Sequence, residues 1–389
     1  MKLDALSHRK EKPASQRGSR KANGLSTVSG KLRPLQDRRG LRTRLLGWYF
    51  QFRRNLPWRR SADPYAIWVS EIMLQQTRVA VVVERYETFL ERFPTITTLA
   101  RAAEDQVLAL WSGLGYYRRA RMLHKAAQFV ADHHAGVLPR TAVELRKLPG
   151  IGSYTAAAIA SIANGEAIAV VDGNVERVLC RLEGWELGGS VGAAEMRRRI
   201  ESLANELVDP GQPGEFNQAM MELGATVCLP RNPQCLVCPL AGNCATQGEH
   251  KTTPRPRMMS QEISYGLMTR RGPEGEEVLL EQRSSSLTVM PGMWELPLLK
   301  EPAVPEAEVR MTLRHAIMLV NYYVRIRSVA EKEVGLLSMI YGERRWIPVA
   351  AAEGMALTGL ARKVLKRAHL FGNLLVEGTS AETRDRDKA

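Results

Sequence analysis

Two carboxylic acids in this sequence stand in contexts that could support acid–base chemistry. The first is Glu71, which shares a helical stripe with Ile67 and Leu74 because residues three and four apart lie on one helix face. A carboxyl group on an apolar stripe is costly to ionise, so its pKa should rise, as suits a general acid at neutral pH. The alternative, a glutamate at the edge of the stripe with its oxygens in water, is equally compatible with this spacing.

The second carboxylic acid, Asp172, follows a glycine-rich turn. Residues 148–156 read LPGIGSYTA and lead into a helix of small residues, Ala156–Ala163. Gly150 and Gly152 permit a positive φ and the close approach of another backbone. The N–H groups at the start of the helix would favour an anion. A phosphate-binding turn followed by Asp172, itself on an Asp-Gly-Asn turn, predicts an enzyme that acts on nucleic acid.

Four cysteines form a third candidate site. They occur within 17 residues in the pattern C-x6-C-x2-C-x5-C, as Cys228, Cys235, Cys238 and Cys244. Four thiolates can hold either zinc or a [4Fe–4S] cluster, and the spacing differs from paired C-x2-C knuckles, which favours iron–sulfur. Arg231, in the loop between the first two cysteines, could contact a phosphate.

Helices must position these residues, because no strand-like alternation is present between Leu41 and Val227. We therefore expect an all-α region. Asp63-Pro64 is typical of a helix start and precedes the segment that carries Glu71. Residues 111–121 join two helices with glycines, tyrosines and arginines. This segment could insert its rings into a base stack, or it could be an ordinary helix–helix turn with core tyrosines.

A second region with a different periodicity follows a proline-rich basic linker at residues 250–260. Its apolar segments predict strands and one terminal helix. The expected strands are Ile263–Thr269 and Val278–Arg283, with further β structure in Leu287–Leu299, Tyr322–Ile326, Leu336–Ile340 and Arg345–Pro348, and the helix is Leu357–Ala368. We expect an α+β domain at residues 261–372 and a disordered tail at 373–389.

The charge of the chain indicates a polyanionic partner. Its 389 residues carry a formal charge of +14, with a pI of about 9.8, which fits nucleic acid or a membrane surface. Residues 1–40 are rich in Lys, Arg, Ser and Gly, and we interpret them as a disordered basic arm that adds affinity for phosphates. A tail without a role, or a wrongly assigned start codon, is an equal alternative. No apolar stretch is long enough for a membrane span, so we expect a soluble cytoplasmic protein.

Six motifs occur in the order found in one enzyme family. They are LPWR at 56–59, SEIMLQQT at 70–77, GLGYY at 113–117, the turn at 148–156, the Asp172 turn and the four-cysteine spacing. Together they resemble the MutY-type adenine DNA glycosylases of the helix–hairpin–helix DNA glycosylase superfamily, over about Leu41 to Leu370. The resemblance implies a multidomain protein. It would have an all-α helix–hairpin–helix glycosylase domain at 41–249, with a [4Fe–4S] loop at 228–244, and an α+β Nudix-like domain at 261–372.

The resemblance also implies a reaction: removal of adenine mispaired with 8-oxoguanine or guanine from double-stranded DNA, by a monomer, in base excision repair. Glu71 would protonate the adenine, and Asp172, supported by Asn174, would stabilise or capture the sugar cation. Tyr154 would sit at the reaction centre. The implied DNA contacts are Leu56, Trp58 and Arg59 in the base pocket, Gln76 and Tyr116 in the stack left by the flipped adenine, and Gly150 and Gly152 on a phosphate.

Tyr154 separates this family from its relatives. Proteins that resemble endonuclease III have a lysine there, whose amine forms the Schiff base needed for strand cleavage. Tyrosine cannot form one, so we expect a monofunctional glycosylase. The alternatives are an endonuclease III-like glycosylase/lyase, a non-catalytic iron–sulfur protein that binds DNA, and a Nudix hydrolase with a DNA-binding appendage. The metal-binding helix of Nudix hydrolases is absent from the sequence, which argues against the last.

The C-terminal region departs from the family pattern at one point. Residues 290–297, MPGMWELP, match the Nudix-like domain, but Ile317-Met318-Leu319 follows His315-Ala316 where the family commonly has Phe-Ser-His. Met318 cannot donate the hydrogen bond that a serine would offer to 8-oxoguanine. Either Asn321 or a neighbour replaces it, or discrimination against guanine is weaker.

Overall fold

The computed structural model describes residues 37–186, 191–250, 258–301, 304–317, 319–338 and 342–371. Residues 1–36 of the predicted basic arm, residues 251–257 of the predicted linker and the predicted tail at 373–389 therefore lie outside the described residues. Helix α1 (Arg38–Phe52) begins before the predicted boundary at Leu41. It starts there because Asp37 accepts a hydrogen bond from the N–H of Gly40 at 2.7 Å and so caps the first turn.

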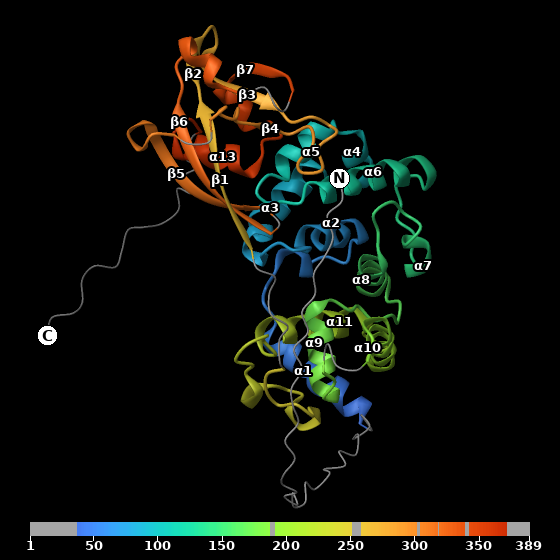
Figure 1. The fold of residues 1–389 in the computed structure, drawn as a ribbon. Coiled ribbons are helices and arrows are strands. Elements are labelled where there is room, and N and C mark those ends of the chain that lie inside the picture. The colour runs from blue at the N-terminus through green and yellow to red at the C-terminus, as the bar shows by residue number, and fades with distance from the viewer. Residues whose placement is uncertain are drawn as a thin grey trace, which may run out of the picture. The chain divides into compact units, whose positions relative to one another are not determined.

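Helices build the described part of the chain up to residue 250 (Figure 1). After α1 come η1 (Pro57–Arg59), α2 (Pro64–Leu74), α3 (Val79–Arg92), α4 (Ile96–Arg101), α5 (Glu104–Leu110), α6 (Arg118–His133), α7 (Ala142–Leu145), α8 (Ser153–Asn164), α9 (Gly173–Glu183), α10 (Ala193–Leu207), α11 (Pro213–Thr226), η2 (Cys235–Val237) and η3 (Ala241–Asn243). None of the described residues in this part lies in a strand, which confirms the all-α prediction.

The helices pack as two groups. Helices α2 to α8 surround a core whose fully buried side chains include Trp68, Phe89 and Trp111. In the second group α1 packs on α11, and α11 and α10 pack on α9 (Figure 1). The groups meet at α8, because both α2 and α11 pack against it. Side chains of α2 and α11, which are far apart in sequence, can therefore face one cavity.

Helix α2 is buried along nearly its whole length. Asp63 caps it by accepting hydrogen bonds from the first backbone N–H groups, and Pro64 occupies the first turn, as predicted. The helical pattern in the sequence continues to Thr77, but the helix ends at Leu74. It ends there because Gln76 adopts a φ of 55°, outside the right-handed helical region.

Two sheets and two helices form the described part of the chain from residue 258 (Figure 1). The elements are β1 (Met259–Leu267), β2 (Thr269–Gly272), β3 (Gly275–Gln282), β4 (Trp294–Glu295), η4 (Glu306–Glu308), β5 (Val309–Ile317), β6 (Val320–Ser328), η5 (Glu331–Leu336), β7 (Arg344–Pro348), α12 (Val349–Glu353) and α13 (Gly359–Arg367). β6 pairs parallel with β1 and antiparallel with β5, whereas β3 pairs antiparallel with β2, β4 and β7. The α+β prediction is confirmed.

Three strand predictions are wrong in detail. Strand β5 is absent from the prediction, although Val309, Met311 and Leu313 alternate with polar residues along it. Of its residues Leu313 alone is buried, and pairing with β6 completes the strand. Conversely, Leu287–Leu299 contains a strand of two residues, Trp294–Glu295, although its apolar side chains are buried. The described part of Leu336–Ile340 contains one isolated bridge, at Leu337.

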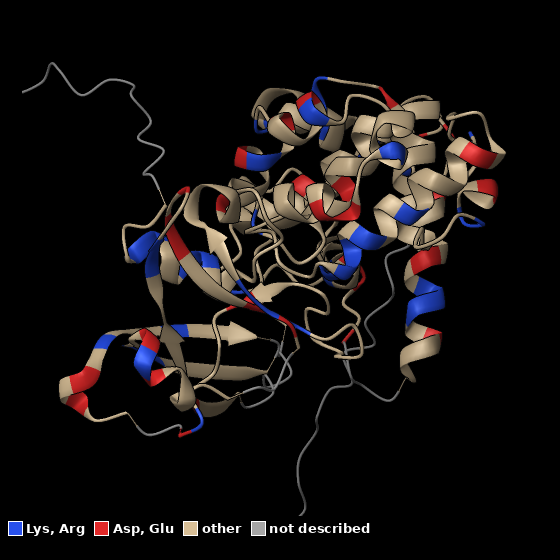
Figure 2. Ribbon diagram, turned by 90° about the horizontal axis from the view of Figure 1, so that it is seen from above, with Lys and Arg blue, Asp and Glu red and all other residues tan. Residues whose placement is uncertain are grey.

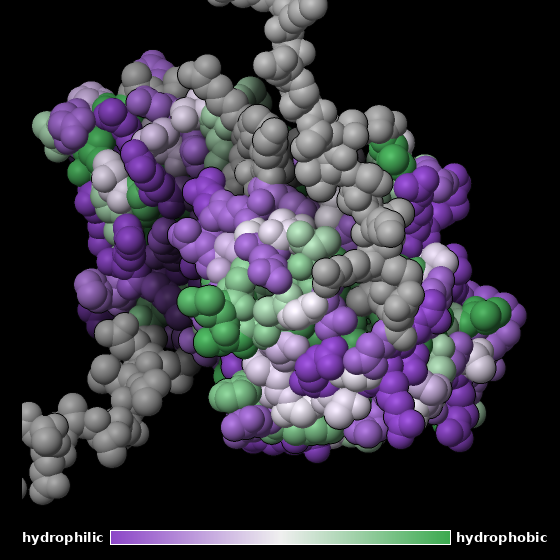
Figure 3. Space-filling model, turned by 90° about the horizontal axis from the view of Figure 1, so that it is seen from below, coloured by the Kyte–Doolittle hydropathy of each residue, from purple (hydrophilic) through white to green (hydrophobic). Residues whose placement is uncertain are grey.

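Charged residues of both signs are distributed over the helices and strands (Figure 2). On α10, for example, Glu195 forms ion pairs with Arg198 at 2.7 Å and with Arg199 at 3.0 Å. On the face shown in Figure 3, hydrophobic residues occur in patches among hydrophilic ones. Within the described ranges, no helix is both long and apolar enough to cross a membrane.

Candidate active site

A cavity of about 590 Å³ lies between α2, α8, the start of α9 and α11. Eight of the residues predicted from the sequence line it, namely Leu56, Trp58, Arg59, Glu71, Gln76, Tyr154, Asp172 and Asn174. Tyr116 and Gly150 line a neighbouring cavity of about 380 Å³, which Gln76 also lines. Gly152, Arg231 and the four cysteines line neither cavity. The two predicted carboxyl groups are therefore brought together in one cavity.

Glu71 is buried, with 5% of its surface exposed. Its Oε2 accepts a hydrogen bond from the hydroxyl of Tyr154 at 2.8 Å. Burial raises the pKa of Glu71 to about 7, against the lowering effect of the Tyr154 hydrogen bond and with a further increase from the charge of Asp172. Burial likewise raises the pKa of Tyr154 well above its usual value, so its hydroxyl keeps the proton that it donates. The interpretation of Glu71 as a water-exposed residue is wrong.

Asp172 caps the N-terminus of α9. Its Oδ1 accepts hydrogen bonds from the backbone N–H groups of Asn174 at 2.9 Å and Val175 at 2.8 Å. Its Oδ2 accepts a third from the side-chain amide of Asn174 at 2.8 Å. These three donors fix the orientation of the carboxylate and stabilise negative charge on it. The Asp-Gly-Asn turn thus caps α9, and its residues Asp172 and Asn174 also line the cavity.

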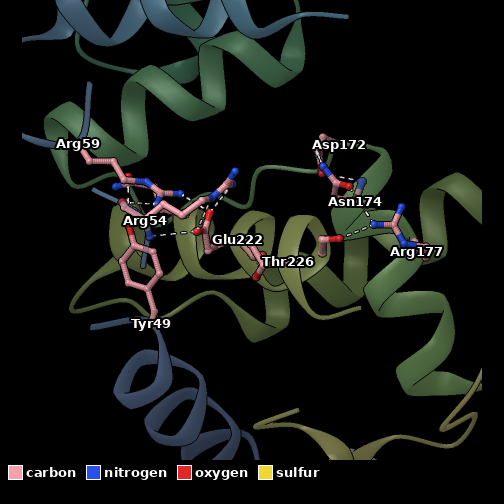
Figure 4. A network of polar contacts seen from close by, with 10 residues as sticks. Tyr49, Arg54, Arg59, Asp172, Asn174, Arg177, Glu222 and Thr226 are labelled. Carbon is pink, nitrogen blue, oxygen red and sulfur yellow. Dashed lines mark hydrogen bonds and ion pairs between the residues drawn. The ribbon is translucent and has the colours of Figure 1, made fainter. Parts of the chain in front are cut away.

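Arg177, which sequence analysis did not identify, holds Asn174 in place (Figure 4). Its guanidinium donates to Asn174 Oδ1 at 2.9 Å and to the carbonyl of Gly224 on α11 at 2.7 Å. Its Nε donates to the carbonyl of Cys228 at 2.8 Å. The arginine therefore joins the Asp172 cap to α11 and to the first cysteine. Its position one helical turn after Asn174 is the signal that could have identified it.

Glu222 on α11 is a second site residue that sequence analysis missed. It is 1% exposed, and its Oε2 accepts hydrogen bonds from Arg54 at 2.7 Å and Arg59 at 2.8 Å (Figure 4). Burial alone would raise the pKa of Glu222, but the two arginines outweigh it and lower the pKa to about 2. The Arg59 guanidinium also lies 5.5 Å from the centre of the Tyr49 ring. Ionised Glu222 and this ring hold Arg59 at the cavity wall.

The glycine-rich turn precedes α8. Gly150 adopts a φ of 75°, and a Cβ added to it would lie 2.8 Å from Met122 Cβ, so the turn requires glycine there. Gly152 is the N-cap of α8 with a φ of −84°, and a Cβ added to it would meet nothing within 4 Å. Gly152 is therefore not needed for a positive φ; it leaves open space beside the N-terminus of α8, which no side chain caps.

The four cysteines line one cavity together with Arg181. Two groups donate toward their sulfur atoms: Arg181 Nη1 lies 3.3 Å from Cys228 Sγ, and the N–H of Gln247 lies 3.4 Å from Cys244 Sγ. Among the described residues, no group of three or more His, Cys, Asp or Glu side chains is arranged tightly enough to hold a metal ion. Arg231 is exposed at the surface of the same loop.

The segment that carries the two carboxyl groups matches a known family. Residues 69–222 match the description "HhH-GPD superfamily base excision DNA repair protein". Residues 69–222 of this chain belong to the HhH-GPD superfamily. The part that matches the superfamily runs from α2 to Glu222 on α11 and includes Glu71, Tyr154 and Asp172.

Curated members of similar sequence share one name. The chain is 50% identical over 209 residues to adenine DNA glycosylase of Homo sapiens, which covers 51% of this chain and 38% of that protein. It is 44% identical over 255 residues to adenine DNA glycosylase of Mus musculus, which covers 62% of this chain and 49% of that protein. The chain thus spans less than half of these relatives. A solved thermostable thymine-DNA glycosylase is 30% identical, with 54% of this chain and 96% of that one covered and a TM-score of 0.49.

Proposed function

We propose that this chain is an adenine DNA glycosylase of base excision repair, which hydrolyses the N-glycosidic bond of adenine mispaired with 8-oxoguanine or guanine. Its curated relatives of that name are 50% and 44% identical to it. The observation that carries the proposal is a single cavity that holds both Glu71, with a pKa of about 7, and the triply hydrogen-bonded Asp172. Glycoside cleavage passes through an oxocarbenium-like state, for which one protonated and one ionised carboxyl group are suited.

Glu71 is the proposed general acid. Its pKa of about 7 leaves a substantial fraction of the carboxyl groups protonated at neutral pH, and such a proton can be passed to the adenine ring to make it a leaving group. The Tyr154 hydroxyl holds Glu71 Oε2 at 2.8 Å and so orients the carboxyl group. A positioned general acid typically contributes about 10²–10⁴-fold to the rate.

Asp172 is the proposed partner of the sugar cation. As adenine leaves, positive charge develops on the sugar, and a fixed carboxylate can stabilise it or form a covalent bond with it. Asn174 and the first backbone N–H groups of α9 hold the carboxylate before the reaction begins. Preorganised charge of this kind needs no rearrangement during the reaction.

The adenine must leave the duplex to reach these groups. We propose that Leu56 and Trp58 form the apolar walls of the pocket that receives it and that Arg59 supplies polar contacts. Gln76 and Tyr116 would fill the space left in the base stack. Phosphates would be bound by the N–H groups after Gly150 and Gly152, at the open N-terminus of α8, and by the exposed Arg231.

The reaction proposed here stops at base removal. Strand cleavage by a lyase requires an amine that forms a Schiff base with the sugar. None of the described residues that line the cavity is a lysine. The resemblance places Tyr154 where proteins that resemble endonuclease III have the lysine. We therefore expect no coupled strand cleavage.

We further propose that Cys228, Cys235, Cys238 and Cys244 hold a [4Fe–4S] cluster. The four cysteines line one cavity, and N–H groups of Arg181 and Gln247 lie 3.3 Å and 3.4 Å from the sulfur atoms of Cys228 and Cys244, where they could donate to the thiolate ligands of a cluster. The donor set is soft and contains sulfur alone, which fits iron–sulfur or zinc. The C-x6-C-x2-C-x5-C spacing differs from paired C-x2-C knuckles, which favours the iron–sulfur cluster. When bound, the cluster would cross-link residues 228–244.

The C-terminal region is the proposed Nudix-like reader of 8-oxoguanine. Next to the point of departure from the family pattern, Ile317 ends β5 and Val320 begins β6, and the two strands form the end of an antiparallel ladder. Met318 lies outside the described residues. Asn321 is part of β6, beside this tip, and is the proposed substitute for the missing serine.

The proposal is tested by measuring adenine release from a duplex under single-turnover conditions. Wild type, Glu71→Gln and Asp172→Asn should be compared on A·8-oxoguanine and A·G duplexes, with circular dichroism as the control for folding. Both variants should lose at least about 10²-fold in rate, and no duplex should be cleaved at the abasic site without added base. Wild-type rates in both variants would falsify the mechanism. Equal rates on the two mispairs would show that the hairpin does not read 8-oxoguanine.

A further inference from the structure

A buried arginine joins two segments that the proposed function places in the DNA. Arg119, on the first turn of α6, donates from Nη1 to the carbonyls of Ile72 at 2.7 Å and Met73 at 3.0 Å, and also to that of Gln75. Its Nη2 donates to Thr77 Oγ1 at 2.9 Å and to the carbonyls of Leu114 at 3.0 Å and Gly115 at 3.1 Å. One guanidinium therefore holds both the end of α2 and the turn before α6.

These contacts also cap the C-terminal end of α2. The last four carbonyls of a helix have no partner within the helix, and two of the carbonyls that Arg119 binds, those of Ile72 and Met73, belong to this set. The positive charge also interacts favourably with the C-terminal end of the helix dipole. Arg119 thus binds carbonyls that a further turn of α2 would otherwise bind, and the chain leaves the helix axis at Gln76.

Gln76 and Tyr116 directly follow carbonyls that Arg119 binds, those of Gln75 and Gly115. Both adopt a left-handed backbone conformation, with φ of 55° and 48°. For residues other than glycine this conformation is strained, and it persists where the surroundings enforce it. The Arg119 guanidinium also lies 5.6 Å from the centre of the Tyr116 ring.

The two residues are set side by side by the same group. Gln76 and Tyr116 line one cavity of about 380 Å³ together with Arg119 and Gly150. Thr77 strengthens the link, because its hydroxyl accepts from Arg119 and donates to the carbonyl of Leu114 at 3.1 Å. Tyr116 is 53% exposed, so its ring is free to enter a base stack.

We propose that Arg119 is a positioning residue that fixes Gln76 and Tyr116 as one rigid pair for insertion into the DNA base stack. The inference rests on the proposed function, since it assumes that these two side chains fill the space of the flipped base. Arg119 itself touches neither the base nor the reacting atoms. It acts by holding the backbone of both inserting residues in a strained conformation that neither would keep alone.

The chemistry of the side chain explains why arginine is needed. The two terminal nitrogens of a guanidinium carry four hydrogens in a fixed planar fork, and in Arg119 these are shared among five carbonyls and a hydroxyl on two segments. A lysine keeps the charge but offers three donors from one nitrogen, which cannot span both segments. Arg119→Lys therefore preserves the charge and removes the link.

The first experiment measures base extrusion directly. 2-Aminopurine replaces the target adenine opposite 8-oxoguanine, and its fluorescence is followed as the duplex is mixed with wild type, Arg119→Lys or Arg92→Lys. Arg92, exposed near the end of α3, is the matched control. Arg119→Lys should slow the fluorescence increase about tenfold, whereas Arg92→Lys should leave it unchanged. An unchanged trace for Arg119→Lys would overturn the proposal.

The second experiment separates positioning from a general loss of structure. Gln76→Ala/Tyr116→Ala and the triple variant with Arg119→Lys are measured in the same assay. If Arg119 acts through the two side chains, the triple variant should be no slower than the double variant. A triple variant that is slower than the double variant by the full factor measured for Arg119→Lys alone would overturn the proposal. If Arg119→Lys does not fold, Thr77→Val is the substitute, because it removes the hydroxyl that links Arg119 to Leu114. Thr77→Val should also slow base extrusion. An unchanged extrusion rate in Thr77→Val would contradict the proposal.

Failure of this inference can be told apart from failure of the proposed function. Fluorescence reports extrusion whether or not the base is cleaved, and release of adenine is assayed separately. A wild type that extrudes 2-aminopurine but releases no adenine would refute the glycosylase and leave the role of Arg119 intact. The pH dependence of adenine release should keep its midpoint in Arg119→Lys, because Glu71 is not among the partners of Arg119.

Discussion

At the scale of single residues, burial gives the two carboxyl groups of the cavity different tasks. Glu71 has lost its water and titrates near neutrality, while Asp172 is held by three donors at the start of a helix. The hydroxyl of Tyr154 is the only side-chain hydrogen bond to Glu71 found among the described residues, and it opposes the effect of burial. Tyr154 therefore adjusts the pH at which Glu71 keeps its proton.

A pH dependence follows from this balance. Glu71 is active when protonated, so adenine release under single-turnover conditions should be constant below pH 7 and should fall about tenfold per unit above it. Tyr154→Phe removes a hydrogen bond that lowers the pKa of Glu71, and the alkaline decline should move to higher pH. Rates of wild type and Tyr154→Phe measured between pH 5 and pH 9 (roughly two units either side of the midpoint) show whether the decline moves. A decline that stays in place, or moves to lower pH, would contradict this assignment.

Site residues could be predicted from the sequence where their partners are close along the chain, and they were missed where the partners are distant. Glu71 could be predicted because its neighbours on the stripe are three and four residues away. Glu222 could not, since its partners Arg54 and Arg59 are 168 and 163 residues distant. Arg119 also escaped, because an arginine within a basic, aromatic segment suggests a phosphate contact, whereas in the fold it binds backbone carbonyls.

At the scale of elements, helical periodicity identified the all-α region, but pairing decided the β region. Strand β5 has an apolar alternation at Val309, Met311 and Leu313 that sequence analysis overlooked, and it pairs with β6 with a register shift between Val309 and Met311. The site likewise depends on one helix–helix contact. The Asp172 cap of α9 is held against α11, where Asn174 lies directly over Gly224. The contact between α9 and α11 has no local sequence signal.

The close contact of α9 with α11 makes Gly224→Ala a sharp test. The added Cβ would lie 2.6 Å from Asn174 Cβ and 3.0 Å from its carbonyl oxygen, so Asn174 must move and its hydrogen bond to Asp172 must change. Adenine release should fall by about 10²-fold, the scale expected for a displacement near 1 Å. In a helix interior alanine is more favourable than glycine by about 1 kcal/mol, so helix propensity alone would stabilise the Gly224→Ala variant and cannot explain a loss of activity.

Gly47→Ala on α1 is the matched control for that substitution, because its Cβ would meet nothing within 4 Å. It should leave adenine release unchanged. Thermal unfolding of both variants, followed by circular dichroism, separates a displaced carboxylate from an unfolded protein. Full activity of a folded Gly224→Ala would mean that the Asn174 contact does not position Asp172.

At the scale of the whole molecule, positive charge is unevenly distributed along the chain. Residues 1–36 contain nine Lys and Arg and two Asp and Glu, a net charge of 9 − 2 = +7, which leaves +7 of the total +14 for the other 353 residues. The helices and strands carry both signs (Figure 2). Half of the net charge thus lies outside the part of the chain that holds the cavity.

This separation predicts that DNA affinity and catalysis can be uncoupled. Each phosphate neutralised by Lys or Arg contributes about −0.9 to the slope of log Kobs against log salt concentration. A variant in which the nine Lys and Arg of residues 1–36 are replaced by Gln keeps the length of the chain. It should bind an undamaged duplex more weakly and with a shallower salt slope, measured by fluorescence anisotropy at several salt concentrations.

The single-turnover rate of this variant at saturating enzyme and its pH midpoint near 7 should match wild type, because Glu71 and Asp172 are untouched. An unchanged salt slope would show that residues 1–36 do not contact phosphates, and a changed pH midpoint would show that they act on the cavity itself.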